Sequence, residues 1–243
     1  MKIAILFGGS YSLGWGRSQN MARALSAEGH DVWHIDQISP LHKTRSLTPS
    51  INQQPDKVTV VSGISALPYI RYPKLNRINT FFMKTQFNAL IKTIEAVDVI
   101  IFYGVPQPWV QDYILENIPH AVALYDCADD KQETFSDLKD STTGSAVHNW
   151  ERALLEKVAG VSAINTKLME KLVGKKSIAS LVIPNGIDCT VFPTRPFTRP
   201  VQNERKLIFA GALNERLDIE RITSLAHQEG VTIDFYGPHH PIV

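Results

Sequence analysis

The stretch that divides this chain reads VIPNGIDCTVF and occupies residues 182–192. Its β-branched start stops at Pro184, turns on Asn185-Gly186, and is followed by three more prolines before residue 201. This order predicts a strand, a tight turn and a linker. We therefore interpret it as a hinge between two domains. The predicted divisions are an amino-terminal domain at 1–184, a hinge and linker at 185–204, and a second domain at 205–243.

Composition limits what the hinge can join. The chain has 243 residues, 44% of them hydrophobic, and a formal net charge of +1. A nucleic-acid partner is not supported, because such binders are normally strongly basic. The two cysteines, Cys127 and Cys189, show no metal-ligand spacing and no disulfide framework, which favours a reducing, cytoplasmic compartment. No apolar run approaches the roughly 18 residues of a membrane span.

Strand and helix patterns alternate along the amino-terminal domain, which predicts an α/β fold with a parallel sheet and crossover helices. An apolar strand at residues 2–7 runs into a glycine-rich loop that contains Gly8, Gly9, Gly14 and Gly16. Bare backbone amides before a helix can approach an anion, although such a loop can equally serve only as a tight turn. Residues 39–56 lack periodicity and are interpreted as a surface loop.

Residues 71–96 carry an apolar stripe at helical spacing, with four Lys or Arg residues near its start. One interpretation is a helix that faces the core and has a solvated basic end. The other adds Phe81 and Phe82 to the cations of 71–87 and makes a peripheral membrane patch, which needs apolar burial and attraction to anionic lipid. Both remain open at this point.

An acidic cluster follows the strand predicted at residues 121–125 and includes Asp126, Asp129 and Asp130. Ligands of open α/β sheets bind outside the carboxyl ends of the strands, where this cluster lies. One of these carboxylates can hold a metal, accept a proton from a hydroxyl, or simply cap the next helix. No ligand set argues for a metal. Farther along, Asn165 has the position of a helix cap.

The residues after the linker begin a second α/β unit. A strand at 206–210 ends at Gly211, a helix is expected at 218–229, and a second strand at 231–236 ends at Gly237. This length is too short for a complete parallel sheet of typical domain size.

The segments VIPNGIDCTVF, KLIFAGALNERLDIERI and VTIDFYGP together resemble family 4 glycosyltransferases of the GT-B fold. The amino-terminal GG…GWGRSQNMARALSAEGHDV and the YDCADD segment fit the same family. The nearest subgroup is that of teichuronic-acid and related cell-surface polysaccharide glycosyltransferases. The resemblance covers nearly the whole chain and implies two Rossmann-like domains that face each other across a cleft.

The resemblance implies transfer of a sugar from a nucleotide diphosphate sugar to an acceptor hydroxyl on a glycan or lipid-linked acceptor, with retention of configuration and no cofactor or metal. By position it implies catalytic roles for Asp126 first and Asp130 second. The implied donor-binding residues are Gly8, Gly9, Asn185, Gly211, Arg216 and Gly237. The implied acceptor-side residues are Gly14, Gly16, Arg17 and Tyr103.

Two departures from the family qualify this expectation. After Gly211 only Arg216 is placed to clamp the diphosphate, and the usual lysine is missing. The E-x7-E element that grips the donor would lie beyond Val243. We therefore expect a truncated or split protein that alone binds nucleotide sugars weakly or not at all. A separately encoded carboxyl-terminal half would complete it. The alternatives are an inactive sugar-binding or partner-binding module and, in third place, a nucleotide-sugar epimerase.

Overall fold

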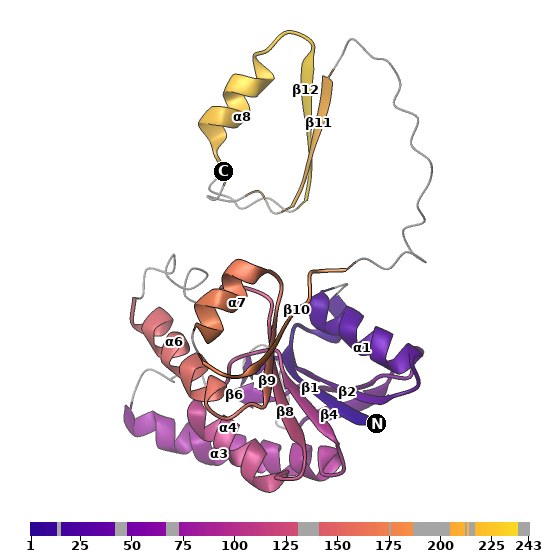
Figure 1. Cartoon of the computed structure of the whole chain (residues 1–243), viewed down its shortest axis with the longest axis vertical. Coiled ribbons are helices and arrows are strands. Elements are labelled where there is room, and N and C mark those ends of the chain that lie inside the picture. Colours follow the sequence, from indigo (N-terminus) through magenta and orange to yellow (C-terminus); the bar gives the residue numbers. More distant parts are fainter. Residues whose placement is uncertain are drawn as a thin grey trace. The chain divides into compact units, whose positions relative to one another are not determined.

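The computed structural model describes residues 1–13, 16–41, 48–66, 73–130, 141–174, 176–186, 205–211, 213 and 217–237. The chain forms two compact units, Met1–Asp188 and Cys189–Val243 (Figure 1). We call them unit 1 and unit 2. No helix of the described ranges is long and apolar enough to cross a membrane.

Unit 1 is built on an eight-stranded sheet with the order β10-β9-β8-β7-β1-β2-β5-β4. Every neighbouring pair is parallel except β4 and β5, which are antiparallel. The strands of this sheet are β1 (Lys2–Gly8), β2 (Asp31–Asp36), β4 (Ser50–Gln53), β5 (Thr59–Ser62), β7 (Val99–Phe102), β8 (Val122–Cys127), β9 (Gly160–Ala163) and β10 (Ala179–Val182). A separate short parallel pair consists of β3 (Ser39–Pro40) and β6 (Ser65–Ala66).

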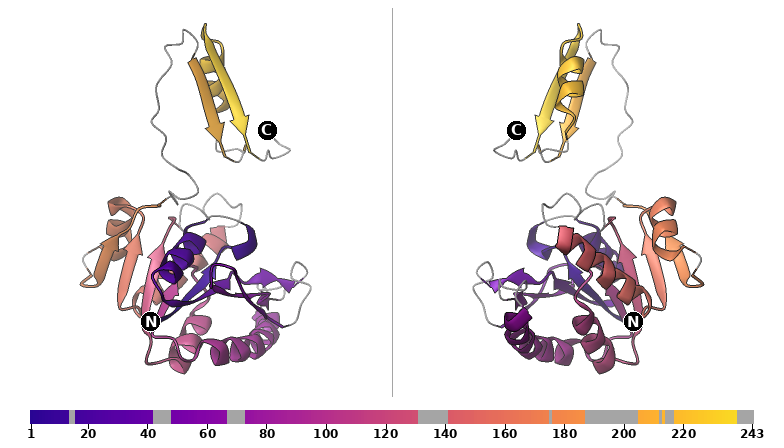
Figure 2. Two further views of the ribbon diagram at one scale, coloured as in Figure 1. Left: turned by 90° about the vertical axis from the view of Figure 1, so that its right-hand side faces the viewer. Right: turned by 90° about the vertical axis from the view of Figure 1, so that its left-hand side faces the viewer.

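Helices lie on both faces of the sheet (Figures 1 and 2). They are η1 (Tyr11–Leu13), α1 (Arg17–Ala27), α3 (Pro73–Ile94), α4 (Pro108–Asn117), α6 (Ser141–Leu155) and α7 (Thr166–Val173). A small core joins α1 to one face through Ile5, Ala22 and Val32. Tyr11 of η1 belongs to the same small core, and a larger core joins α3, α4, α6 and α7 to the opposite face. Burial on both faces explains why β1 is a continuous apolar run, as is typical of parallel strands.

The hydrophobic patterns predicted much of this arrangement, including the α/β class and the face that α3 turns to the core. The stripe expected at residues 71–96 is buried on α3, as Met83, Phe87, Leu90, Ile91 and Ile94. The cap expected at Asn165 is confirmed, because its side-chain oxygen accepts from the Leu168 backbone N–H at 2.8 Å.

The interpretation of residues 39–56 as a loop is wrong in part. Within that range the structure forms β3 and β4, and β4 pairs antiparallel with β5. All four residues of β4 are exposed, so the strand is held by backbone hydrogen bonds and leaves no hydrophobic alternation to detect.

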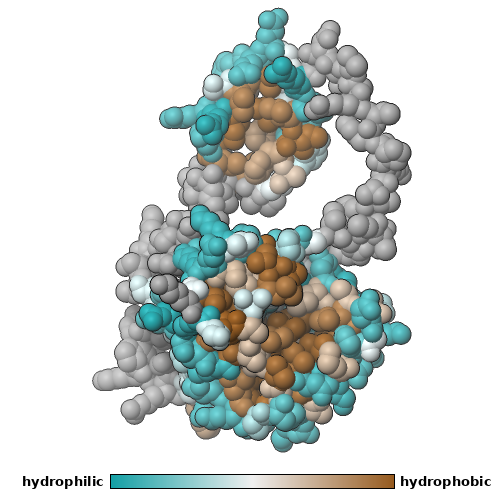
Figure 3. Space-filling model, in the orientation of Figure 1, coloured by the Kyte–Doolittle hydropathy of each residue, from teal (hydrophilic) through white to brown (hydrophobic). Residues whose placement is uncertain are grey.

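The described residues of unit 2 form one β-α-β element. It contains β11 (Arg205–Ala210), α8 (Ile219–Ala226) and β12 (Val231–Tyr236), and the two strands pair in parallel. Asp218 caps α8 by accepting from the Arg221 backbone N–H at 3.0 Å. None of the described residues of unit 2 is buried. Hydrophobic atoms consequently gather on its surface (Figure 3).

Candidate active site

At the carboxyl end of β1, one of the central strands of unit 1, the backbone has an unusual conformation. Phe7 has φ of 62°, and the pairing of β1 with β2 shifts register between Leu6 and Gly8. A Cβ at Gly104 would lie 2.7 Å from the Phe7 Cβ, so only glycine fits beside this turn of the chain. A non-glycine residue at positive φ is strained, and such strain clusters at functional sites.

A buried ion pair connects α1 to the end of β8. The Arg17 Nε and Nη2 atoms donate to the two carboxylate oxygens of Asp126, each at 2.8 Å. The Arg17 side chain is 9% exposed and that of Asp126 is 1% exposed. Ser162 on β9, the register partner of Asp126, donates to Asp126 Oδ1 at 2.6 Å. The carboxylate therefore accepts three hydrogen bonds, and Arg17 is held in the planar two-bond geometry that guanidinium and carboxylate favour.

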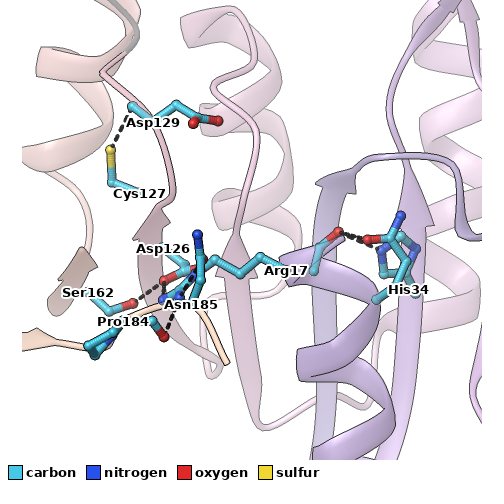
Figure 4. A network of polar contacts seen from close by, with 10 residues as sticks. Arg17, His34, Asp126, Cys127, Asp129, Ser162, Pro184 and Asn185 are labelled. Carbon is cyan, nitrogen blue, oxygen red and sulfur yellow. Dashed lines mark hydrogen bonds and ion pairs between the residues drawn. The ribbon is translucent and has the colours of Figure 1, made fainter. Parts of the chain in front are cut away.

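Arg17 also holds the segment that leaves β10. Its Nη1 atom donates to the Pro184 carbonyl at 3.1 Å and to the Asn185 side-chain oxygen at 3.3 Å. Figure 4 shows Arg17 extending from the start of α1 to these groups. Hydrogen bonding to Asp126 raises the pKa of Arg17 above its ordinary value, so the cation is permanent. One side chain thus joins the first helix, the acidic strand end and the predicted hinge.

Tyr103, directly after β7, belongs to the same electrostatic environment. Burial, and after it the negative charges of Asp129 and Asp126, raise the pKa of Tyr103 to about 12 against the opposing charge of Arg17. Its hydroxyl is therefore protonated at neutral pH and can donate a hydrogen bond.

The glycine loop after β1 packs at Gly8 against a buried histidine. A Cβ at Gly8 would lie 2.5 Å from His34 Nε2 and 2.6 Å from Ser18 Oγ. His34 is fully buried, and its Nε2 lies 3.2 Å from Ser18 Oγ. Its Nδ1 lies 3.3 Å from Asp36 Oδ1 but makes no aligned hydrogen bond. Close packing on His34 therefore accounts for Gly8 without any ligand.

The rest of the loop is held by polar contacts to its own surroundings. The Tyr11 backbone N–H donates to Asp36 Oδ1 at 3.0 Å, and Gln19 Nε2 donates to the Ser10 carbonyl at 3.0 Å. Gly9 lies beside Gln19, whose Nε2 would be 3.3 Å from a Cβ at position 9. Gly16 is the N-cap of α1 and has no side chain to accept from the first turn, so those amides are not capped by a side chain.

The two glycines predicted in unit 2 lie against each other at its strand ends. The Gly211 backbone N–H donates to the Tyr236 carbonyl at 2.9 Å. Gly237 has φ of 147°, and a Cβ there would lie 2.0 Å from the Gly211 carbonyl oxygen. A side chain at position 237 is therefore excluded by the backbone itself.

The predicted site residues thus fall into separate groups. Gly8, Gly9, Gly16, Arg17, Tyr103, Asp126 and Asn185 belong to the strand ends and hinge of unit 1. Gly211 and Gly237 meet in unit 2. Asp130 pairs instead with Lys171 of α7, at 2.5 Å. Gly14 and Arg216 lie outside the described residues, as does Cys189, whereas Cys127 is a buried cysteine whose thiol donates to the Asp129 carbonyl at 3.3 Å.

Three residues of this region escaped the sequence reasoning. Ser162 was not singled out because its partner Asp126 is set by strand register, which a single sequence does not give. His34 lies inside an apolar strand, where a lone histidine carries no signal of the Gly8 contact. Phe7 has an ordinary hydrophobic side chain, and its unusual φ depends on the bulge. Within the described ranges, no three His, Cys, Asp or Glu side chains are grouped so as to hold a metal ion.

No family model matches the chain, and no curated protein matches it significantly. Solved structures do. One is a sucrose-phosphate synthase from Thermosynechococcus elongatus, with a TM-score of 0.52, 16% identity, and coverage of 79% of this chain and 93% of that one. Another is the trehalose-6-phosphate synthase of E. coli bound with UDP-2-fluoro glucose, with a TM-score of 0.60 and 8% identity. The match covers 99% of this chain and 65% of the trehalose-6-phosphate synthase chain.

These similarities establish the fold class. Both solved structures are GT-B glycosyltransferases, and the parallel sheet described above has the Rossmann-like form of that fold. The chain therefore has a glycosyltransferase-like α/β fold of the GT-B type.

Proposed function

We propose that this chain is a nucleotide-sugar-dependent glycosyltransferase, or the larger part of one. The observation that carries the proposal is the group formed by the glycine loop, the Arg17–Asp126 ion pair and Asn185 at the strand ends of a GT-B fold. Ligands of open parallel sheets bind at this edge. A structural neighbour was solved with UDP-2-fluoro glucose, which supports a nucleotide sugar as the donor.

The chemistry of sugar transfer requires that negative charge on the leaving diphosphate be stabilised as the bond to the sugar breaks. In unit 1 a cation, a protonated phenol and uncapped amides are available for this, from Arg17, Tyr103 and the start of α1. Asp126 already accepts hydrogen bonds at both oxygens. We propose that Asp126 serves the reaction by fixing the position of the Arg17 guanidinium. The alternative is that Asp126 acts directly on the acceptor hydroxyl.

Substitution of Asp126 by Asn distinguishes these roles in an active preparation. Direct action predicts a large fall in turnover with nearly unchanged donor affinity, whereas a loss of Arg17 placement predicts that donor affinity falls together with turnover. Asp130 remains a second catalytic candidate. Asp130→Asn tests that candidate separately, because the Asp130 carboxylate pairs with Lys171 and not with Arg17.

The donor is tested by titrating the chain with a panel of UDP- and GDP-sugars, followed by calorimetry and by backbone amide NMR. We expect weak binding, with shifts concentrated at Gly8, Gly9, Arg17 and Asn185. The absence of any shift at millimolar ligand would contradict the transferase proposal. Micromolar binding would instead contradict the proposal that the donor side is incomplete.

We further propose a hexosyltransferase-type role in cell-surface polysaccharide synthesis, in family 4, at the cytoplasmic face of a membrane, with a glycan or lipid-linked acceptor. The basis is the motif resemblance at residues 182–192 and 206–238. A separately encoded carboxyl-terminal half would complete the donor side, and the exposed apolar residues of unit 2 are consistent with such a partner. An inactive binding module gains support if no such half is encoded near this gene.

A further inference from the structure

A pocket outside the strand-end group lies between α6 and α7. Its volume is about 210 Å³, and it is lined by His148, Arg152, Leu155, Leu168, Lys171 and Lys176. Leu155 and Leu168 are buried residues of the large core, so the pocket has an apolar floor under a polar rim. Pockets for drug-sized ligands span roughly 300–1,000 Å³, so this one suits a ligand the size of a single sugar and not a whole nucleotide sugar.

Two donors of the pocket are available for a ligand. His148 and Arg152 are four residues apart on α6 and therefore lie on one helix face. Both line the pocket, and within the described ranges neither side chain makes a hydrogen bond or a close ion pair, although the charge of Arg152 helps to lower the pKa of the exposed Glu156. The other polar groups are engaged. Lys176 pairs with Glu156, and Lys171 pairs with Asp130.

The charge of the lining indicates the kind of ligand. Three cations, Arg152, Lys171 and Lys176, face the pocket together with the carboxylates Asp130 and Glu151. Glu151 is buried and its carboxylate accepts from the Tyr125 hydroxyl at 2.5 Å, so it is directed into the core network. Because Lys171 and Lys176 are paired with Asp130 and Glu156, Arg152 is the cation of this lining that can pair with an added anion. A guanidinium is suited to bind phosphate oxygens, and an apolar floor suits the carbon face of a sugar ring.

We propose that the pocket between α6 and α7 binds a phosphorylated monosaccharide, with Arg152 and His148 donating to the phosphate and Leu155 and Leu168 packing on the sugar. This site is separate from the proposed nucleotide-sugar site and does not depend on transferase activity.

The test is a calorimetric titration of the whole chain with glucose 6-phosphate, inorganic phosphate and glucose. We expect glucose 6-phosphate to bind most tightly, phosphate more weakly, and glucose not measurably. Arg152→Gln and His148→Gln should each weaken glucose 6-phosphate binding by about tenfold or more, as expected for loss of one charge-assisted hydrogen bond. Lys92→Gln, an exposed lysine on α3, is the matched control and should leave the affinity unchanged.

Each other outcome overturns the proposal. No binding of glucose 6-phosphate or phosphate at millimolar concentration excludes an anion site. Equal binding of glucose excludes recognition of the phosphate, and equal binding of phosphate alone excludes the sugar contact. Unchanged affinity in both α6 variants places the ligand elsewhere. A failure to bind UDP- or GDP-sugars bears only on the transferase proposal and leaves this site standing.

Discussion

Among individual residues, Asp126 should contribute the most to stability of any site residue. Removing one partner of a buried ion pair leaves the other charge without compensation, which costs about 3–5 kcal/mol. Asp126→Asn should therefore lower the free energy of unfolding by about that amount in urea denaturation. Asp112→Asn is the control, because Asp112 pairs with Lys157 but its side chain is 50% exposed. The control should change stability by about 1 kcal/mol at most. Equal losses in the two variants would show that the Arg17 pair is not a buried one.

Tyr103 gives the site a distinct signature at high pH. Its pKa in the folded chain is raised to about 12 from an ordinary 10.0, mainly by burial. Below pH 10 the phenol is protonated in the folded and in the unfolded chain, so the contribution of Tyr103 to the free energy of unfolding is fully present. As pH rises from about 10 to about 12 the unfolded chain loses the proton first, and the free energy of unfolding falls.

The Tyr103→Phe variant should lose this part of the pH dependence. Absorbance titration of tyrosinate, taken as wild type minus variant, should show a phenol that ionises near pH 12. A difference spectrum that titrates near pH 10 would show that Tyr103 is solvated and not part of the buried site.

At the scale of elements, the strands and helices that could be predicted were those whose hydrophobic residues recur at the spacing of a strand or a helix. The buried strand β1 and the core stripe of α3 follow from side chains that must leave water. The strand β4 does not, since its four side chains are exposed and it is joined to β5 by backbone pairing and by the Ser50–Ser62 hydroxyl contact at 2.8 Å.

The candidate site was predictable to the extent that strand ends converge. Asp126 was singled out in this way, because it follows a recognisable strand, whereas Asn185 was singled out by the family resemblance. Their joint contact with Arg17 was not, because it requires the register of β8 beside β9 and the path of the chain after β10. The spacing of residues in one sequence gives neither the strand register nor the path of the chain.

The helix α3 is where the membrane proposal is tested. Ile78 and Phe81 are 56% and 73% exposed, lie one turn apart, and are followed by the exposed Lys84. We propose that this apolar and basic face contacts anionic lipid. Phe81→Ser should reduce cosedimentation with phosphatidylglycerol vesicles several-fold, because burial of the ring in the interface is lost. Ile51→Ser on β4, with 53% exposure, is the control and should bind as the parent does. Equal binding by all three proteins would exclude α3 as the contact.

At the scale of the whole molecule, the two units differ in how much apolar surface they bury. Unit 1 has helices on both sheet faces and two hydrophobic cores. In its described residues unit 2 has one helix for two parallel strands, and Leu207, Ile208 and Tyr236 are 40%, 65% and 57% exposed. Parallel sheets are normally covered on both faces, so unit 2 has the strand pairing of a Rossmann-like domain without its usual burial.

This difference predicts that unit 2 opens independently of unit 1. Local opening is easiest where few apolar contacts hold an element, so amides of β11, α8 and β12 should exchange with deuterium about a hundredfold faster than those of β1, β7 and β8. Hydrogen exchange of the intact chain, followed by mass spectrometry of peptides, measures this directly. The amides of β9 provide the internal control, since that strand is short but buried in unit 1. Protection of β11 and β12 equal to that of β1 would show that unit 2 is covered in solution, by a second copy of the chain or by residues outside the described ranges. Loss of that protection on dilution would identify the cover as a second copy, because only association between chains depends on concentration.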